Sequence, residues 1–231
     1  MTDRLSEQAA SIGALAEPVR RALYVFVVAQ HDAVSREQAA EGVDVPLHTA
    51  KFHLDKLVEE GLLDVEFRRL TGRTGPGAGR PSKLYRRSTR ELSVSLPERR
   101  YDVVGRILAA GVDRAVGGDV EVRAAVREVA VEEGRRVAQA TTAAGSGLEQ
   151  VASVLAEQGY EPVPRDGDLL LANCPFDALA REHTELVCGL NESFVGGVVD
   201  GLGCAGLVAR LDPEEGLCCV KVGGEPGPSR T

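Results

Sequence analysis

Residues 35–61 read SREQAAEGVDVPLHTAKFHLDKLVEEG, a stretch that contains two helix starts. Ser35, with Gln38 three positions later, is the capping-box arrangement that opens a short helix. Pro46 suits the first position of a second helix, which Gly61 then ends. The apolar residues of this second helix recur at the spacing of one buried face: Ala50, Leu54, Leu57 and Val58. The stretch therefore predicts two helices joined by a short turn.

The flanking segments predict a core helix on one side and a pair of strands on the other. Over residues 9–30, apolar residues fall at helical spacing: Ile12, Leu15, Val19, Leu23 and Phe26. After Gly61, residues 62–70 and 83–88 have strand patterns, and the Gly/Pro-rich residues 71–81 separate them. This order of elements is that of a winged helix-turn-helix.

The predicted second helix and wing also carry residues suited to DNA. The first turns of the helix present side chains away from the buried face, where recognition helices meet base edges and phosphates. Residues 67–100 hold ten basic residues against two acidic ones, although the whole chain has a net charge of -8. A solvated basic linker is the alternative interpretation of this charge. The candidate DNA-binding residues are His48, Thr49, Lys51, Phe52, Arg73, Arg80 and Lys83.

Residues 35–40, 49–63 and 79–86 together resemble winged-helix regulators of the ArsR/DeoR type. The resemblance spans about residues 10–90 and implies a DNA-binding transcriptional regulator.

Two further helices are expected between residues 101 and 143. The second, over about residues 119–143, carries Val and Ala on more than one face, which indicates a dimer seam; packing within the chain is the alternative. A two-fold dimer would read two half-sites, so a palindromic operator of double-stranded DNA is the expected partner.

The acidic remainder has an α/β pattern and holds all five cysteines. We expect strands near residues 160–164, 169–173, 207–211 and 217–222, with helices over 148–158 and 175–202. Cys174, Cys188, Cys204 and Cys218 are separated by 13, 15 and 13 residues, and Cys219 follows directly. If residues 175–188 formed one straight helix, the sulfurs of Cys174 and Cys188 would lie about 20 Å apart. A shared site therefore requires a helix break, for which Thr184 offers an N-cap.

Thiols grouped in this way, in a chain with no leader or membrane segment, favour a metal or redox centre in the cytoplasm over disulfides. Converging thiolates can hold an iron–sulfur cluster or a zinc ion, and small buried hydrophobes are the plainer alternative. A thiol enzyme with a low-pKa cysteine and His183 as base is a further alternative, but no catalytic motif supports it.

Residues 173–188, 211–213 and 216–220 resemble the C-terminal half of the SufR-type iron–sulfur repressors, especially their actinobacterial relatives. The resemblance implies a [4Fe-4S] or [2Fe-2S] cluster held by Cys174, Cys188 and Cys218, with Cys204 as the fourth ligand and Cys219 or His183 as substitutes. It also implies control of iron–sulfur assembly genes.

The sequence thus predicts an α+β protein that is a homodimeric, cytoplasmic repressor rather than an enzyme. Its parts are a winged helix-turn-helix domain (1–95), a helical dimerisation region (96–145), an α/β cysteine-containing sensor domain (146–224) and a tail (225–231). A winged-helix regulator that senses zinc or a small effector is the alternative.

Overall fold

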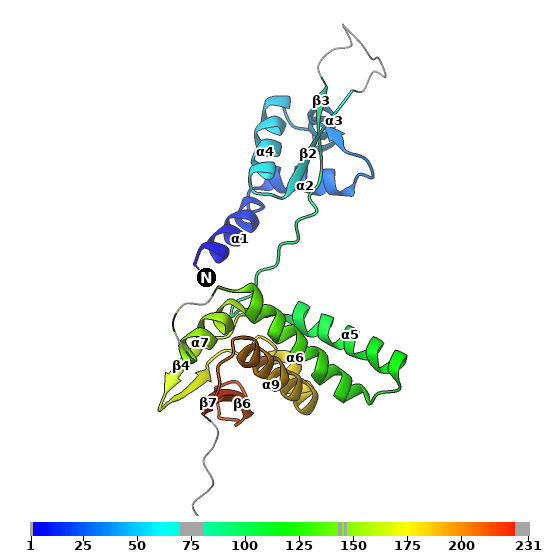
Figure 1. Ribbon diagram of the computed structural model, residues 1–231. Helices are drawn as coiled ribbons and strands as arrows, with labels where there is room; N and C mark the ends of the chain where they lie inside the picture. The colour runs from blue at the N-terminus through cyan, green and yellow to red at the C-terminus, as the bar shows by residue number, and fades with distance from the viewer. Residues whose placement is uncertain (1, 70–80, 143–144, 146, 225–231) are drawn as a thin grey trace, which may run out of the picture. The chain divides into compact units, whose positions relative to one another are not determined.

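The chain forms two compact units, each described here by itself. The computed structural model describes residues 2–69, 81–142, 145 and 147–224, and it divides the chain into unit 1, Met1–Val94, and unit 2, Ser95–Thr231 (Figure 1). The boundary after Val94 lies one residue before residue 95, the end predicted for the DNA-binding domain. The two segments expected as a dimerisation region and a sensor domain share one hydrophobic core in unit 2.

Unit 1 packs helices against a small sheet. Its elements are α1 (Thr2–Ala14), α2 (Pro18–Ala29), β1 (Val34–Ser35), α3 (Arg36–Val43), α4 (Leu47–Glu59), β2 (Leu63–Arg68) and β3 (Ser82–Arg87). The strands pair antiparallel in the order β1-β3-β2, and Val65 of β2 lies opposite Tyr85 of β3. Leu23, Leu54 and Leu57 are fully buried in the core between helices and sheet.

Local capping decides where these helices begin. Ser35 accepts a hydrogen bond from the backbone N–H of Gln38 at 3.2 Å, and the Gln38 side chain accepts one from the Ser35 N–H at 2.8 Å, which confirms the capping box. The single helix expected over residues 9–30 is instead two helices. Glu17 caps α2 by accepting from the N–H groups of Val19 and Arg20, and Pro18 occupies the first turn, where its missing N–H has no cost.

Two predicted segments differ from the structure or lie outside it. The helix predicted to begin near residue 9 starts earlier, because α1 runs from Thr2 onward. The wing residues Arg73 and Arg80 lie in residues 70–80, and the predicted tail is residues 225–231; both segments are outside the described residues.

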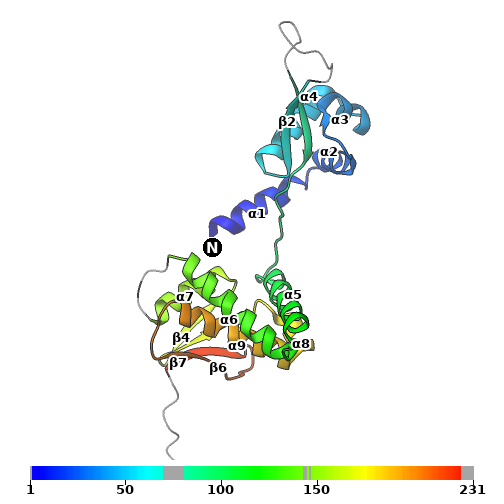
Figure 2. The ribbon, with the colours of Figure 1, turned by 45° about the vertical axis from the view of Figure 1, so that its right-hand side comes forward.

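Unit 2 stacks three long helices on an antiparallel sheet. Its elements are α5 (Tyr101–Gly118), α6 (Val122–Ala140), α7 (Leu148–Glu157), β4 (Pro162–Arg165), β5 (Asp168–Leu171), α8 (Asp177–Glu182), α9 (Thr184–Gly201), β6 (Leu207–Leu211) and β7 (Val220–Gly224). The strand order is β4-β5-β7-β6, and every pairing is antiparallel. This part is therefore an α+β arrangement, and the α/β pattern expected for it was wrong. Figure 2 shows α9 between the sheet and α6, with α5 beyond α6.

Helix α6 is covered on two sides within its own chain. Its buried residues face α5 on one side and α9 on the other. This accounts for the two apolar faces that indicated a dimer seam on this helix. The contact with α9 is a backbone contact: a Cβ added to Gly134 would lie 2.1 Å from the Phe194 carbonyl oxygen, and one added to Gly197 would lie 2.2 Å from that of Val131.

Among the described helices, none combines the length and the apolar character that crossing a membrane requires.

We expect Gly197→Ala to destabilise unit 2 by about 1–3 kcal/mol, because the added methyl group must push α9 away from the Val131 carbonyl. Gly196→Ala is the matched control, since its Cβ would lie 4.0 Å from the Ala209 Cβ, an ordinary contact. That control should leave stability unchanged or raise it by up to about 1 kcal/mol through helix propensity. Chemical denaturation of both variants measures the difference, and equal stabilities would contradict the close helix contact.

Candidate functional site

The first turns of α4 present a polar and aromatic surface to solvent. His48 and Lys51 are exposed, Thr49 is half-buried, and the Phe52 ring is 64% exposed. Ala50, on the opposite face, is fully buried. The structure therefore gives this helix a buried face and an exposed face, and the predicted DNA-binding residues of the helix lie outside the buried face.

Lys83 of β3 is engaged with α4 rather than standing free. Its Nζ lies 2.5 Å from Asp55 Oδ1, and the same oxygen accepts a hydrogen bond from the Tyr85 hydroxyl at 2.9 Å. Burial acts to raise the pKa of Asp55, but the hydrogen bonds from Lys83 and Tyr85 outweigh it and lower that pKa. Burial and the Asp55 contact raise the pKa of Tyr85 well above its usual range. Lys83 therefore fixes the β2–β3 hairpin to α4.

His53 has a packing role. Its ring is half-buried, and Nδ1 accepts a hydrogen bond from Arg20 Nε at 3.3 Å.

In unit 2, four of the five cysteines come together from three segments. Cys174 lies in the loop between β5 and α8, Cys188 in the early part of α9, and Cys218 and Cys219 directly before β7. Cys218 interacts with the thiols of Cys174 and Cys219, and Cys219 also interacts with Cys188. Cys188 and Cys218 are buried, while the other two are partly exposed.

The helix break that the shared site requires is present at His183. This residue ends α8 and begins α9, and the predicted cap Thr184 instead donates its hydroxyl to the Ala180 carbonyl at 2.8 Å. The break turns the chain so that Cys188 approaches the other thiols.

The thiol group shares its protons unequally. Hydrogen bonds from Cys174 and Cys219 lower the pKa of Cys218, and the backbone N–H of Val220 and the side chain of Asn191 act in the same direction. The Cys218 contact and burial raise the pKa values of Cys174 and Cys219. The group therefore favours a single thiolate, centred on Cys218.

Two buried polar residues support this thiolate, and the sequence reasoning missed both. Asn191 Nδ2 donates to Cys218 Sγ at 3.2 Å, and Asn191 Oδ1 accepts from the Tyr160 hydroxyl at 2.5 Å. Asn191 lies three residues after Cys188 on α9, on the same helix face. That spacing is the signal by which the sequence could have identified Asn191.

The structure does not bring Cys204 or His183 to the group. Cys204 follows the far end of α9, and its Sγ lies 3.8 Å from the Gly147 carbonyl oxygen. Cys188 and the end of α9 at Gly201 are separated by about 20 Å at 1.5 Å per residue. The His183 side chain is exposed. Cys219 thus takes the place beside Cys174, Cys188 and Cys218 that was predicted first for Cys204.

The four thiols have the donor chemistry of an iron site, since cysteine thiolates are the usual ligands of iron–sulfur clusters. Their contacts form a chain, Cys174 to Cys218 to Cys219 to Cys188. Within the described parts of the chain, no three His, Cys, Asp or Glu side chains are arranged as a ready-made site for a metal ion. The sulfurs are therefore neighbours that binding of a metal centre would have to draw into place.

The helix-turn-helix domain family matches residues 15–66, which include α2, α3 and α4. No curated protein and no solved structure matches the chain. The family match, together with the exposed face of α4, indicates a DNA-binding transcriptional regulator of the winged-helix kind.

We expect Lys51→Ala to weaken binding to a random-sequence DNA duplex and to reduce the slope of log K against log salt by about one, because one phosphate contact is lost. Lys56→Ala is the matched control on the same helix, since Lys56 is paired with Glu59 and Glu60 at 3.0 and 2.7 Å. Fluorescence anisotropy at several salt concentrations measures both slopes. A Lys51→Ala slope equal to that of the unaltered chain would remove Lys51 from the interface.

Proposed function

We propose that the chain is a transcriptional repressor in which an iron–sulfur cluster held by unit 2 governs DNA binding by unit 1. The observation that carries the proposal is the convergence of four cysteines in a chain that also has a helix-turn-helix domain. Cys174, Cys188, Cys218 and Cys219 are the proposed ligands. The resemblance to SufR-type repressors adds iron–sulfur assembly genes as the expected targets.

The surrounding residues have separate tasks in this proposal. Asn191 donates to the Cys218 sulfur, and the wholly buried Tyr160 holds the Asn191 amide in the orientation that permits it. The buried Phe176 packs edge-on against Tyr160, with 6.2 Å between ring centroids, and so helps to hold the Tyr160 ring in place. When bound, the cluster would supply electron-transfer and oxidant-sensitive chemistry. Hydrogen bonds to ligand sulfurs are among the factors that set cluster potential.

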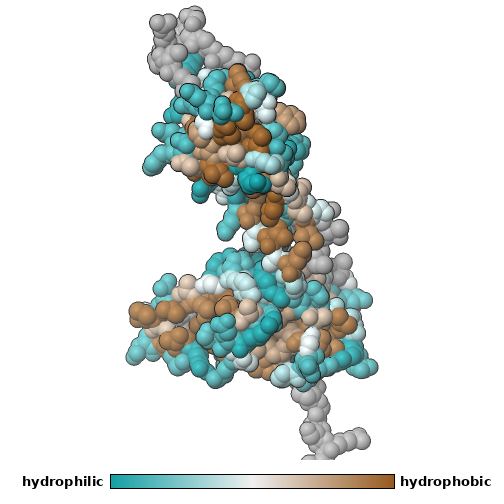
Figure 3. Space-filling view, turned by 180° about the vertical axis from the view of Figure 1, so that it is seen from behind, coloured by the Kyte–Doolittle hydropathy of each residue, from teal (hydrophilic) through white to brown (hydrophobic). Residues whose placement is uncertain are grey.

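We also propose that the repressor is a homodimer that reads a palindromic operator, with the outer face of α5 as its seam. This face lies opposite the one packed on α6 and is apolar along the helix. Val112 is 46% exposed and Val116 is 83% exposed. Figure 3, a view from behind, shows hydrophobic side chains gathered along this edge of unit 2.

The charges beside the α5 face favour a second copy as the occupant. Arg106 and Asp113 flank the same side of the apolar stripe and lie equally far from the helix midpoint between Ala109 and Ala110. In an antiparallel pair of α5 helices related by a two-fold axis, Arg106 of each copy faces Asp113 of the other. Opposite charges in register add to the apolar contact and fix its direction.

We expect anaerobically purified protein to absorb at about 400 nm, as clusters held by thiolates do. It should also contain iron and sulfide in matching amounts. Cys219→Ser should lose most of this iron, whereas Cys204→Ser, the matched control, should keep it. The reverse result would make Cys204 the fourth ligand. A colourless protein after anaerobic reconstitution would refute the cluster, and a stoichiometric zinc content would favour the zinc-sensing alternative.

We expect the double variant Val112→Glu/Val116→Glu to be a monomer of 24.5 kDa where the unaltered chain is a dimer, because four charges would meet across the seam. Val163→Glu on β4 is the control, since Val163 is 45% exposed, close to the value for Val112. Analytical ultracentrifugation measures the masses. A dimeric double variant would show that the seam lies elsewhere.

A further inference from the structure

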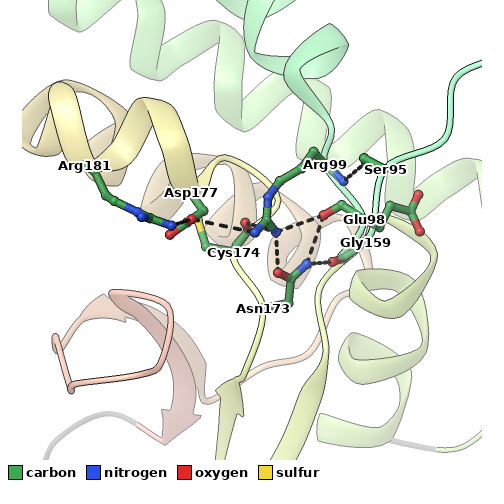
Figure 4. A network of polar contacts seen from close by, with 8 residues as sticks. All are labelled: Ser95, Glu98, Arg99, Gly159, Asn173, Cys174, Asp177 and Arg181. Carbon is green, nitrogen blue, oxygen red and sulfur yellow. Dashed lines mark hydrogen bonds and ion pairs between the residues drawn. The ribbon is translucent and has the colours of Figure 1, made fainter.

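The segment by which the chain enters unit 2 is fastened to the loop that carries Cys174. Arg99 Nη1 donates to Asn173 Oδ1 and, at 3.1 Å, to the backbone carbonyl of Cys174 (Figure 4). The Arg100 backbone N–H donates to the Pro175 carbonyl at 3.0 Å. Residues 95–100 and the cysteine loop, more than 70 positions apart in the sequence, are thereby held together.

Asn173 holds the same segment with its other end. Its Nδ2 donates to the Glu98 carbonyl at 3.0 Å and to the Gly159 carbonyl at 2.6 Å. One amide thus joins three pieces of chain: the entry segment, the turn after α7 and the cysteine loop. We refer to Arg99 and Asn173 with these contacts as the clasp.

The clasp is sheltered from solvent, which strengthens its hydrogen bonds. The Arg99 side chain is 19% exposed and Asn173 is buried. Arg99 Nη2 also lies 3.6 Å from Asp177 Oδ2, so a carboxylate balances the guanidinium charge. Charge-assisted hydrogen bonds in a low dielectric are stronger than neutral ones in water, so breaking the clasp costs more free energy than breaking an exposed contact.

Very little chain separates the clasp from unit 1. Leu92 packs against the hydrophobic core of unit 1, and Ser95 Oγ already accepts a hydrogen bond from the Arg99 N–H at 2.7 Å. Only Ser93 and Val94 lie between these anchored residues. A residue spans at most about 3.6 Å, so the clasp begins only a short stretch of chain after the last residue anchored in unit 1.

We infer that Arg99 is a positioning residue that couples the cysteine group to the DNA-binding unit. The inference rests on the proposed function, in which Cys174 has a ligand-bound and a free state. The carbonyl of Cys174 is an acceptor in the clasp, so a change in the position of Cys174 alters the hold on residues 95–100. Coupling of this kind requires only that the two states of the loop make different contacts with Arg99.

The test uses the whole chain in three versions: the unaltered chain, Arg99→Leu and Arg181→Met. Each version is compared with and without the cluster. First, iron and sulfide are quantified in each. Second, hydrogen exchange is followed over residues 88–100, together with the affinity of both forms for a duplex selected from a random DNA pool. Arg181 is the control because it also pairs with Asp177 but is 75% exposed and makes no clasp contact.

We expect loading to change the DNA affinity of the unaltered chain and of Arg181→Met by about fivefold or more, the lower range of allosteric coupling. Arg99→Leu should keep its iron but lose both this ratio and the exchange difference at residues 88–100. An iron-containing Arg99→Leu with an unchanged ratio would overturn the inference alone. Iron-free unaltered protein would refute the proposed function instead. If Arg99→Leu loses iron or fails to fold, Arg99→Lys decides by the same criteria, because it keeps the charge beside Asp177 but lacks the forked donors.

Discussion

The backbone contact between α6 and α9 positions the whole of unit 2. At Gly134 and Gly197 neither helix has a side chain, so each glycine lies against the backbone of the other helix. This contact seats α9 on the core, and α9 carries Cys188 and Asn191 on one of its faces. Because the sheet packs on another side of α9, the residues before β7 that hold Cys218 and Cys219 are brought to the same place.

Much of unit 1 could be predicted from the sequence because its signals are local. The capping box at Ser35, the stop at Gly61 and the buried stripe of α4 each depend on residues within a few positions of one another. The break at Pro18 was also locally encoded, yet the apolar stripe across it favoured one continuous helix. At this point Pro18 favoured a new helix start, whereas the spacing of the apolar residues favoured one continuous helix. The Glu17 cap fixes the start of α2.

The sequence predicted only some of the cysteines that come together, because their positions depend on the tertiary fold. Spacing along the chain made Cys204 look equivalent to the other three, but the length of α9 carries it away from them. The strand expected near residues 217–222 includes Cys219, whereas β7 begins only at Val220. Residues before the strand are free of its alternation, so both neighbouring thiols can turn to the same side. Buried partners such as Tyr160 left no periodic signal at all.

The electrostatics of the thiol group bear on how the proposed metal centre would bind. Four thiols in contact can lose one proton readily, since the neighbours stabilise a single thiolate at Cys218, but each further thiolate would meet repulsion and burial. A bound cation centre removes that repulsion and requires all ligands to be deprotonated at once. In the proposed function, the metal-bound thiolates and the metal-free thiols would therefore carry different charges. Arg99 and Asn173 fasten the loop that carries Cys174 to the entry segment, so the proposed cluster site lies within a few residues, along the chain, of the connection to the DNA-binding unit.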